Sequence, residues 1–501
     1  MLNWAELKKV VSVSFLLLLL LMMVTAAIHW TMPVAASPET LDVGPSSKYS
    51  TIQDAIDNAS SGDLIFVHDG VYSENIVINK SVSLVGEDRD LVVVNGSEVV
   101  VASGVTVEDL TIRASSSIQS PFTIYSAGNV LENVVIESGF YGLQLLSSYG
   151  NTISNCVISS NQFGVYIYTS DHNVFSFNSI VNNLEAGVEL HSSGYNVFSG
   201  NTIYNNTDGL NLYSSNISNI FYHNNFNNTL QVSTDSVNST NVWSLNGEGN
   251  YWSDYTGQEF NGTGIGDIPY NTDSVGGDGY PLMGPFYDLE PSLAGQTYQV
   301  DLISNSSISG LKFTFGQETG NKIVLFNAAG DEGTVGFGRI MIPLDLMNNT
   351  PFIILGDQGE INPKKLSSSN TTDIYLYFTW SNSNQTISII SSKALQLYSD
   401  LLGDYNYTLD EFNNLTVIQS DLLANYSTLL DSMTYLENKY LALNSSYYSH
   451  LSDYSRNMEN LRNLIYVFAA TTAIFLIATV YLSRSSSTGG KRKFERRENA
   501  D

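Results

Sequence analysis

A repeat of 22 or 23 residues constrains this chain more than any other feature. Asparagine followed by two mostly apolar residues occurs at Asn129, Asn151, Asn173, Asn196, Asn219 and Asn241. A second asparagine follows four or five residues later, at Asn133, Asn155, Asn178, Asn201 and Asn224. A glycine then opens a short alternating segment, at Gly142, Gly164, Gly187 and Gly209. Segments this short cannot bury a face alone, so each must pair in parallel with the equivalent segment one repeat later.

Stacking of the repeats places like residues over like. One interior column is predicted to contain Leu131, Ile153, Phe175, Phe198 and Phe221. A second is predicted to contain Val135, Val157, Ile180, Ile203 and Phe226. The turn asparagines are expected to bond their amides up and down a ladder. The sequence therefore predicts a coiled stack of parallel strands.

Runs such as NTISNCVISSNQFGVYIY and NVFSGNTIYNNTDGLNLY resemble the NosD-type, pectin-lyase-like family of right-handed parallel β-helices, in particular archaeal membrane-anchored surface members. The resemblance covers about Lys48 to Phe286 and implies a β-helix over residues 46–290. At its entrance, Ser50 and Gln53 predict a capping box for a short helix that plugs the coil. Residues 250–286 resemble the closing segment of archaeal members and are predicted to cap the other end.

The charge distribution excludes several functions. The chain has 49 acidic and 21 basic residues, a net charge of −28, and from Ala114 to Leu311 it has 16 acids and no lysine or arginine. Such a surface repels phosphate backbones, which excludes nucleic-acid binding. The family resemblance implies lyases that use a basic residue, but only Lys80, Arg89 and Arg113 are available in the early coils. The single cysteine, Cys156, excludes an internal disulfide and Cys-rich metal sites.

One strand pattern predicts a ligand-binding surface. If Val188 and Leu190 point into the coil, Glu189 and His191 point outward. The outward column of Glu189 is predicted to contain Gln144, Tyr166, Glu189 and Asn211. The outward column of His191 is predicted to contain Leu146, Tyr168, His191 and Tyr213. Tyrosine rings beside a carboxylate, an imidazole and an amide suit sugar recognition. The predicted carbohydrate-binding residues are Tyr166, Tyr168, Glu189, His191, Asn211 and Tyr213; the alternative is that exposed tyrosines simply favour strands.

Three other kinds of site are open at this stage. A polysaccharide hydrolase, the second interpretation, would use the carboxylates Glu189, Asp171 and Asp208. The NosD resemblance implies a role in copper-site maturation, but His172, His191 and His223 are the only coil histidines and no methionine cluster or cysteine pair accompanies them. Calcium is the one cofactor considered, with Asp267, Asp273 and Asp278 as candidate ligands in a Gly/Asn-rich loop, the alternative being a solvated acidic loop.

Beyond the repeat the pattern changes twice. Residues 296–392 contain seven alternating segments, which predicts a β-sandwich that serves as a spacer or adhesion module. From Phe412 to Leu461 apolar residues recur at alternating steps of three and four, which predicts a coiled-coil stalk over residues 396–463 and allows homo-oligomerisation. A single helix folded against the sandwich is the alternative.

Two apolar segments bracket the body. Residues 1–36 are predicted to be a signal peptide, with an uncleaved anchor as the alternative. Residues 464–482 contain no charge and precede a basic tail over residues 483–501, which predicts one transmembrane helix with a cytoplasmic C-terminus. Predicted external glycosylation sites include Asn205, Asn216, Asn227, Asn238, Asn261 and Asn305. The sequence thus favours a single-pass surface protein with a structural or adhesive, glycan-binding role over an enzyme.

Overall fold

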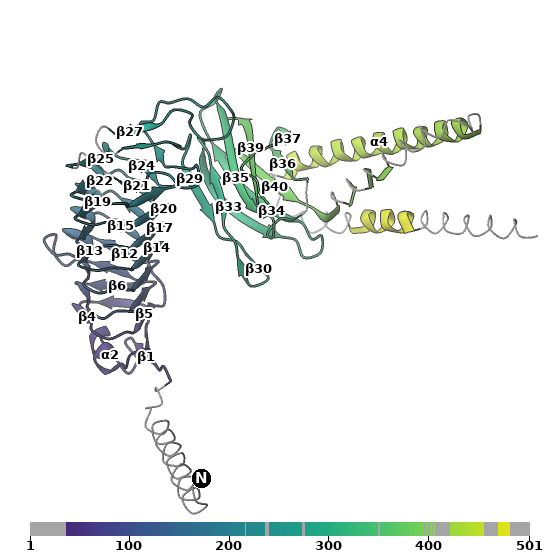
Figure 1. The fold of residues 1–501 in the computed structure, drawn as a ribbon. Coiled ribbons are helices and arrows are strands. Elements are labelled where there is room, and N and C mark those ends of the chain that lie inside the picture. Colours follow the sequence, from purple (N-terminus) through teal and green to yellow (C-terminus); the bar gives the residue numbers. More distant parts are fainter. Residues whose placement is uncertain are drawn as a thin grey trace, which may run out of the picture. The chain divides into compact units, whose positions relative to one another are not determined.

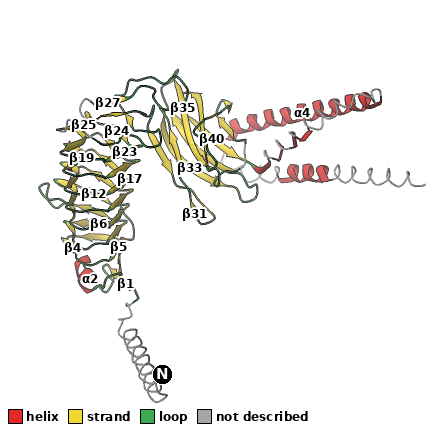
Figure 2. Cartoon of the chain, in the orientation of Figure 1, coloured by secondary structure: helices red, strands yellow, loops and turns green. Residues whose placement is uncertain are grey.

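The computed structural model describes residues 37–215, 217–235, 240–272, 276–348, 351–394, 397–398, 401–402, 404–405, 421–454 and 469–480. The described residues belong to two compact units that divide between Ser399 and Asp400. Figure 1 traces the chain, and Figure 2 shows that the first unit is built mainly of strands. The predicted signal peptide lies outside the described residues.

The first half of the chain is a β-helix made of three parallel sheets. Sheet A contains β1 (Thr40–Val43), β2 (Leu64–Val67), β5 (Ser83–Gly86), β8 (Thr106–Glu108), β11 (Val130–Glu132), β14 (Thr152–Ser154), β17 (Val174–Ser176), β20 (Val197–Ser199) and β23 (Ile220–Tyr222). Sheet B contains β3 (Gly70–Tyr72), β6 (Val92–Asn95), β9 (Thr111–Arg113), β12 (Val135–Glu137), β15 (Val157–Ser159), β18 (Ser179–Val181), β21 (Thr202–Tyr204), β24 (Asn225–Asn227) and β26 (Tyr251–Trp252). Sheet C contains β4 (Ile76–Ile78), β7 (Glu98–Val100), β10 (Phe122–Ile124), β13 (Tyr141–Leu146), β16 (Phe163–Tyr168), β19 (Ala186–His191), β22 (Asp208–Tyr213) and β25 (Leu230–Thr234). The predicted parallel coil is confirmed.

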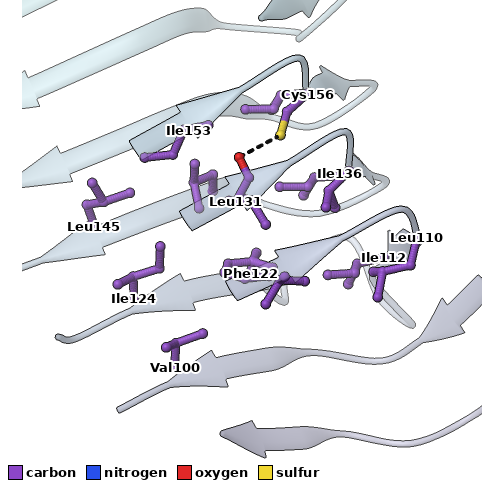
Figure 3. Packing of buried hydrophobic residues seen from close by; sticks show 14 of the residues in the cluster. Val100, Leu110, Ile112, Phe122, Ile124, Leu131, Ile136, Leu145, Ile153 and Cys156 are labelled. Atoms are coloured by element: carbon purple, nitrogen blue, oxygen red, sulfur yellow. Dashed lines mark hydrogen bonds between the residues drawn. The ribbon is translucent and has the colours of Figure 1, made fainter. Parts of the chain in front are cut away.

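The interior is filled by one contiguous apolar core. The first predicted column is confirmed, because Leu131, Ile153, Phe175, Phe198 and Phe221 pair in register and are all buried. Figure 3 shows how side chains of successive coils meet inside. In that view the buried thiol of Cys156 donates to the carbonyl oxygen of Leu131. Burial raises the pKa of this thiol to about 12, so it acts as a small apolar residue.

The second predicted column is wrong in its first two members. Val157 pairs with Ser179, whereas Ile158 pairs with Ile180. The buried column is therefore Ile136, Ile158, Ile180, Ile203 and Phe226. The shift arises in the turn between sheets A and B, where Asn133 and Asn155 adopt positive φ of 53° and 56°. In later coils the second asparagine follows the first by five residues instead of four. A column position counted from the second asparagine therefore differs by one residue between the early and the later coils.

Buried asparagines form three ladders. The first is confirmed, and within it Asn151 and Asn173 each accept from the backbone and side-chain amides of the asparagine one coil earlier. The second runs through Asn178, Asn201, Asn224 and Asn250. A third, absent from the sequence prediction, runs through Asn161, Asn183, Asn206 and Asn228. It explains the glycines, because a Cβ at Gly142 or Gly209 would lie 2.6 Å from a ladder amide nitrogen.

A short helix, α2 (Ile52–Asn58), covers the first edge of sheet C. Ile52, Ala55 and Ile56 are buried as predicted, but the predicted capping box is wrong because Thr51, not Ser50, accepts from the amide of Asp54. Gln53 instead turns toward the sheet, where its side chain accepts from the backbone N–H of Val77 and donates to the carbonyl of the same residue. This contact gives hydrogen-bond partners to the backbone of an edge strand, which would otherwise favour aggregation.

Replacing Lys80 with methionine is expected to lower the free energy of unfolding by about 1.5 kcal/mol. The Lys80 ammonium donates to the carbonyls of Ile56, Asp57 and Ala59 at the end of α2, at 3.0, 2.8 and 2.8 Å. Urea unfolding of the full chain measures the change. The exposed Lys48→Met is the matched control, and an equal loss in both variants would show that total charge, not the helix end, is responsible.

The other end of the coil closes on Asp278, in the hairpin of β27 (Tyr270–Thr272) and β28 (Gly276–Asp278). Its carboxylate accepts from the backbone N–H of Asn250 at 2.7 Å and from the indole N–H of Trp252 at 3.0 Å. The Trp252 ring stacks between Phe226 and Tyr270. Asp278 therefore terminates the second asparagine ladder inside the protein.

Two antiparallel sheets follow and share one apolar core. Sheet D has the order β29 (Phe286–Leu289), β32 (Val300–Ile303), β35 (Val335–Pro343), β39 (Asp373–Ser381) and β38 (Lys364–Lys365). Sheet E has the order β33 (Ser307–Phe315), β34 (Lys322–Ala329), β40 (Gln385–Ser391), β36 (Ile353–Gly356) and β37 (Gly359–Ile361). A small hairpin joins β30 (Ser292–Leu293) to β31 (Gln296–Thr297). The seven predicted segments correspond to β32, β33, β34, β35, β36, β39 and β40, and the short edge strands β29, β37 and β38 were not predicted.

A buried ion pair joins the β-helix to these sheets. Arg339 of β35 contacts Glu248, and it also donates to the carbonyl of Thr263 at 2.9 Å. His223 Nε2 lies 2.7 Å from the other oxygen of Glu248. Burial alone would raise the pKa of Glu248, but the His223 hydrogen bond and the Arg339 charge lower it to about 2. The carboxylate therefore stays ionised between Arg339 and His223.

The second unit contains α4 (Asp421–Tyr454), a single helix of 34 residues inside the predicted stalk. The predicted transmembrane segment is described only over residues 469–480, which are helical. None of the helices in the described ranges is both long and apolar enough to cross a membrane.

Candidate functional site

The predicted site lies on the outward face of sheet C. Strands β13, β16, β19 and β22 pair in the predicted register, which aligns Gln144, Tyr166, Glu189 and Asn211 in one column and Leu146, Tyr168, His191 and Tyr213 in the next. Val188 and Leu190, the alternate residues of β19, are fully buried in the core. The predicted inward and outward alternation is confirmed.

The outward residues differ strongly in exposure. Tyr168 is 47% exposed, whereas Glu189 and Asn211 are only 8% and 6% exposed. Tyr166, His191 and Tyr213 are half-buried. The two shorter polar side chains are therefore buried on a face whose aromatic rings remain partly exposed.

The rings form a continuous series of contacts. His191 stacks on Tyr213 at 4.6 Å and lies 5.2 Å from Tyr166. Tyr166 is parallel to Tyr168 at 6.3 Å. We call this surface the aromatic face; it comprises Tyr141, Phe163, Tyr166, Tyr168, His191 and Tyr213.

Sequence reasoning missed the first two rings of the aromatic face. Tyr141 lies 4.4 Å from Tyr166 and 5.2 Å from Phe163. Tyr141 and Phe163 pair in register at the start of β13 and β16. They precede the repeat glycines, Gly142 and Gly164, by one residue, and that constant offset was the signal that could have found them.

The polar centre of the site is rich in acceptors. His191 Nε2 lies 2.5 Å from Oε1 of Glu189. Within the described part of the chain, Oε2 of Glu189 has no hydrogen-bond partner. Asn211 is the register partner of Glu189, and its Oδ1 is buried and also has no partner there.

The tyrosines around Glu189 remain phenols at neutral pH. Partial burial raises the pKa of Tyr141, Tyr166 and Tyr213, and the negative charge of Glu189 raises each further. Their hydroxyls can therefore donate as well as accept hydrogen bonds.

The other candidate acids lie elsewhere. Asp171 is in the turn beyond the end of β16, where its Oδ1 accepts from the backbone N–H of Gly194 at 2.7 Å. Asp208 begins β22 and aligns with Ala186. The structure therefore does not place Asp171 or Asp208 in the column of Glu189.

The candidate metal ligands are dispersed. His172 stacks on Tyr195 in a turn, His191 contacts Glu189, and His223 contacts Glu248. Asp267 accepts from the N–H of Phe260, Asp278 is buried under the ladder, and Asp273 lies outside the described residues. Over the ranges that the structure describes, no group of three or more His, Cys, Asp or Glu side chains is placed to hold a metal ion.

The three cations of the early coils have structural partners. Lys80 caps α2, Arg89 donates to Asn133 Oδ1 at 2.7 Å, and Arg113 pairs with Glu137 at 2.6 Å.

Comparison with known families identifies the coil. Residues 56–257 match the family model described as "Periplasmic copper-binding protein (NosD)". That match spans the strands from β2 to β26, which build the parallel coils. This segment is a parallel β-helix and is similar to the NosD family.

Proteins similar in sequence to this chain include a surface protein. A cell surface glycoprotein of Methanothermus fervidus is 32% identical over 125 residues, which cover 24% of this chain. The match spans about a fifth, 19%, of that relative's length.

Solved structures with some similarity include a pectin methylesterase and a polygalacturonase. Pectin methylesterase PemA from Erwinia chrysanthemi is 14% identical, covers 39% of this chain and 80% of its own, and has a TM-score of 0.32. Polygalacturonase from Erwinia carotovora is 11% identical, covers 43% of this chain and 76% of its own, with the same TM-score of 0.32.

Proposed function

We propose that this protein is a cell-surface β-helix protein that binds carbohydrate through the aromatic face. The observation that carries the proposal is the continuous series of partly exposed rings above Glu189, His191 and Asn211. Flat rings cover the apolar faces of sugars, while hydroxyl, carboxylate and amide groups bond to sugar hydroxyls. A face that only favoured strand formation would not need polar groups buried beneath its rings.

The length of the face favours an oligosaccharide. Its rings come from four successive strands of sheet C, and parallel strands are spaced by about 4.8 Å. The rings therefore extend over about 15 Å along the coil axis. A chain of sugars lying along this axis contacts more rings than a single sugar can.

Replacing Tyr168 with alanine is expected to weaken glycan binding about tenfold, because it removes the most exposed ring of the face. The control is Tyr204→Ala: Tyr204 is equally exposed, at 47%, but lies on sheet B. A glycan array is first probed with the full-length chain, in a detergent without a sugar headgroup, to identify a glycan that binds. The affinity for this glycan is then measured for the wild type and for both variants. Equal losses in the two variants, or no glycan bound by the wild type, would refute the proposal.

We further propose that the chain is secreted and anchored by one C-terminal span. The basic tail and charge-free segment support this topology, and the relative named as a cell surface glycoprotein agrees with it. Of the proposed glycosylation sites, Asn205, Asn227, Asn261 and Asn305 are exposed, while Asn216 and Asn238 lie outside the described residues.

We also propose that the stalk associates with copies of itself, and the exposed side chains of α4 support this. Apolar side chains at the predicted heptad positions are at least 40% exposed on this helix, namely Leu429, Met433, Leu436, Tyr440 and Leu443. Self-association through this stripe would bury them, as in a coiled coil.

We do not extend copper binding from the family's description to this chain. His172, His191 and His223 lie in three separate surroundings and share no donor set in the described residues. Hydrolysis is likewise not proposed, because Asp171 and Asp208 do not accompany Glu189.

A further inference from the structure

Two acceptor atoms beneath the aromatic face have no hydrogen-bond donor in the described residues. Oε2 of Glu189 has no partner in the described part of the chain, and Asn211 Oδ1 is buried without one. These two side chains are direct neighbours across β19 and β22. A buried acceptor without a partner is costly, so a ligand that brings donors to this point gains more than one that brings acceptors.

The surrounding rings favour positive charge. The Glu189 carboxylate lies near enough to Tyr141, Tyr166 and Tyr213 for its charge to raise the pKa of all three phenols. An aromatic ring carries negative potential on its face and attracts an ammonium group placed over it. Aromatic rings and a carboxylate together therefore form a surface suited to a cation.

The coils that carry the aromatic face contain no cationic side chain to balance a negative ligand. No lysine or arginine occurs between Ala114 and Leu311, which includes every strand of the aromatic face, while 16 acids do. Arg113, which precedes this segment, pairs with Glu137, and the buried Arg339 pairs with Glu248. The field of this segment attracts cations and repels uronate or sulfate groups.

We infer that the aromatic face selects amine-bearing sugars, with the ammonium group against Glu189 and Asn211 and the sugar ring against Tyr168 and Tyr213. This inference rests on the proposed carbohydrate binding and names its substrate class. It also sets the face apart from sites for acidic polysaccharides, which need cationic side chains to hold each carboxylate.

The test compares three oligosaccharides that differ in charge. The full-length chain is titrated with a glucosamine tetramer, its fully N-acetylated counterpart and a galacturonate tetramer at low salt. The glucosamine tetramer is expected to bind at least tenfold more tightly than the acetylated one, and this ratio is expected to fall as salt screens the charge. The galacturonate tetramer is expected not to bind.

Variants assign the preference to the site. Glu189→Gln is expected to bring the two affinities within about twofold of each other. The matched control is Glu185→Gln. Glu185 lies four residues before Glu189, its side chain is exposed outside the aromatic face, and the substitution removes an equal charge. This control is expected to keep the tenfold preference. An equal loss in both variants would show that net charge alone attracts the amine, and would overturn the inference.

The remaining outcomes separate the inference from the proposed function. Equal affinity for the charged and acetylated tetramers, or binding of galacturonate, overturns the amine preference but leaves carbohydrate binding standing. If no glycan binds, on the array or in the titration, both fail.

Discussion

Replacing Asn201 with alanine should lower the free energy of unfolding of the β-helix by about 4 kcal/mol. Asn201 is fully buried in the second ladder. Its Oδ1 accepts from the backbone and side-chain amides of Asn178 at 3.0 and 2.9 Å. Its Nδ2 donates to the carbonyl of Phe175 and to Oδ1 of Asn224, at 2.9 and 2.8 Å. Alanine would leave these groups buried without a partner and create a small cavity.

Urea unfolding of the full-length chain, followed by the fluorescence of Trp243 and Trp252 in the β-helix, measures the loss. The matched control is Asn227→Ala, because Asn227 is exposed at the end of β24. We expect it to change stability by less than about 0.5 kcal/mol. A loss below about 1 kcal/mol for Asn201→Ala would mean that water replaces the carboxamide inside the coil.

The ladder also shows why the sequence predicted the coil but misplaced one column. The 22 or 23 residue period was visible because every coil repeats the same contacts. Asparagine, however, suits two adjacent positions for different reasons: it tolerates positive φ, as at Asn133, and it bonds along a ladder, as at Asn178. Cys156 precedes Asn178 in the ladder, its N–H donating to the Asn178 side chain, and nothing in its residue type indicated that position.

The site was predictable in register but not in burial. Strand alternation was enough to align Tyr166 with Glu189 and Tyr168 with His191. Whether an outward residue is exposed depends on the size of its neighbours in other coils, which are distant in sequence. Glu189 is therefore buried although it points outward, and its acceptor-rich surroundings emerged only from the packed structure.

A buried carboxyl in sheet C gives the largest expected effect. Glu98 of β7 pairs with Ile76 and Phe122 in register, in the column that continues as Leu143 and Val165 inside the coil. Its side chain is fully buried, and neither oxygen has a hydrogen-bond partner in the described residues. Burial raises the pKa of Glu98 to about 8.

This shift makes stability fall as pH rises. The unfolded chain releases the proton near its ordinary pKa of 4.5, whereas the folded chain keeps it until about pH 8. Between these values the unfolded state alone is ionised, so the free energy of unfolding decreases with pH and the penalty is complete above pH 8. At about 1.36 kcal/mol per pKa unit, the full penalty is about 5 kcal/mol.

Replacing Glu98 with glutamine should remove this pH dependence. Because the pI is about 4.3, urea titrations are best run well above it, from pH 5.5 to 8.5. About 3 kcal/mol of the penalty develops over this range. The difference in stability between the variant and the wild type should widen by that amount across the range. Comparing the two chains cancels the titration of all other groups, including Asp301, whose pKa burial raises to about 6.

The exposed Glu185→Gln is the matched control, because it makes the same chemical change on the surface and should run parallel to the wild type at every pH. Parallel curves for Glu98→Gln as well would mean that the Glu98 carboxyl is hydrated within the coil. A widening gap would instead show that a dry core holds a protonated acid at neutral pH. Substituting Glu98 by methionine should then raise stability further, because it also removes the unpaired oxygens from the apolar column.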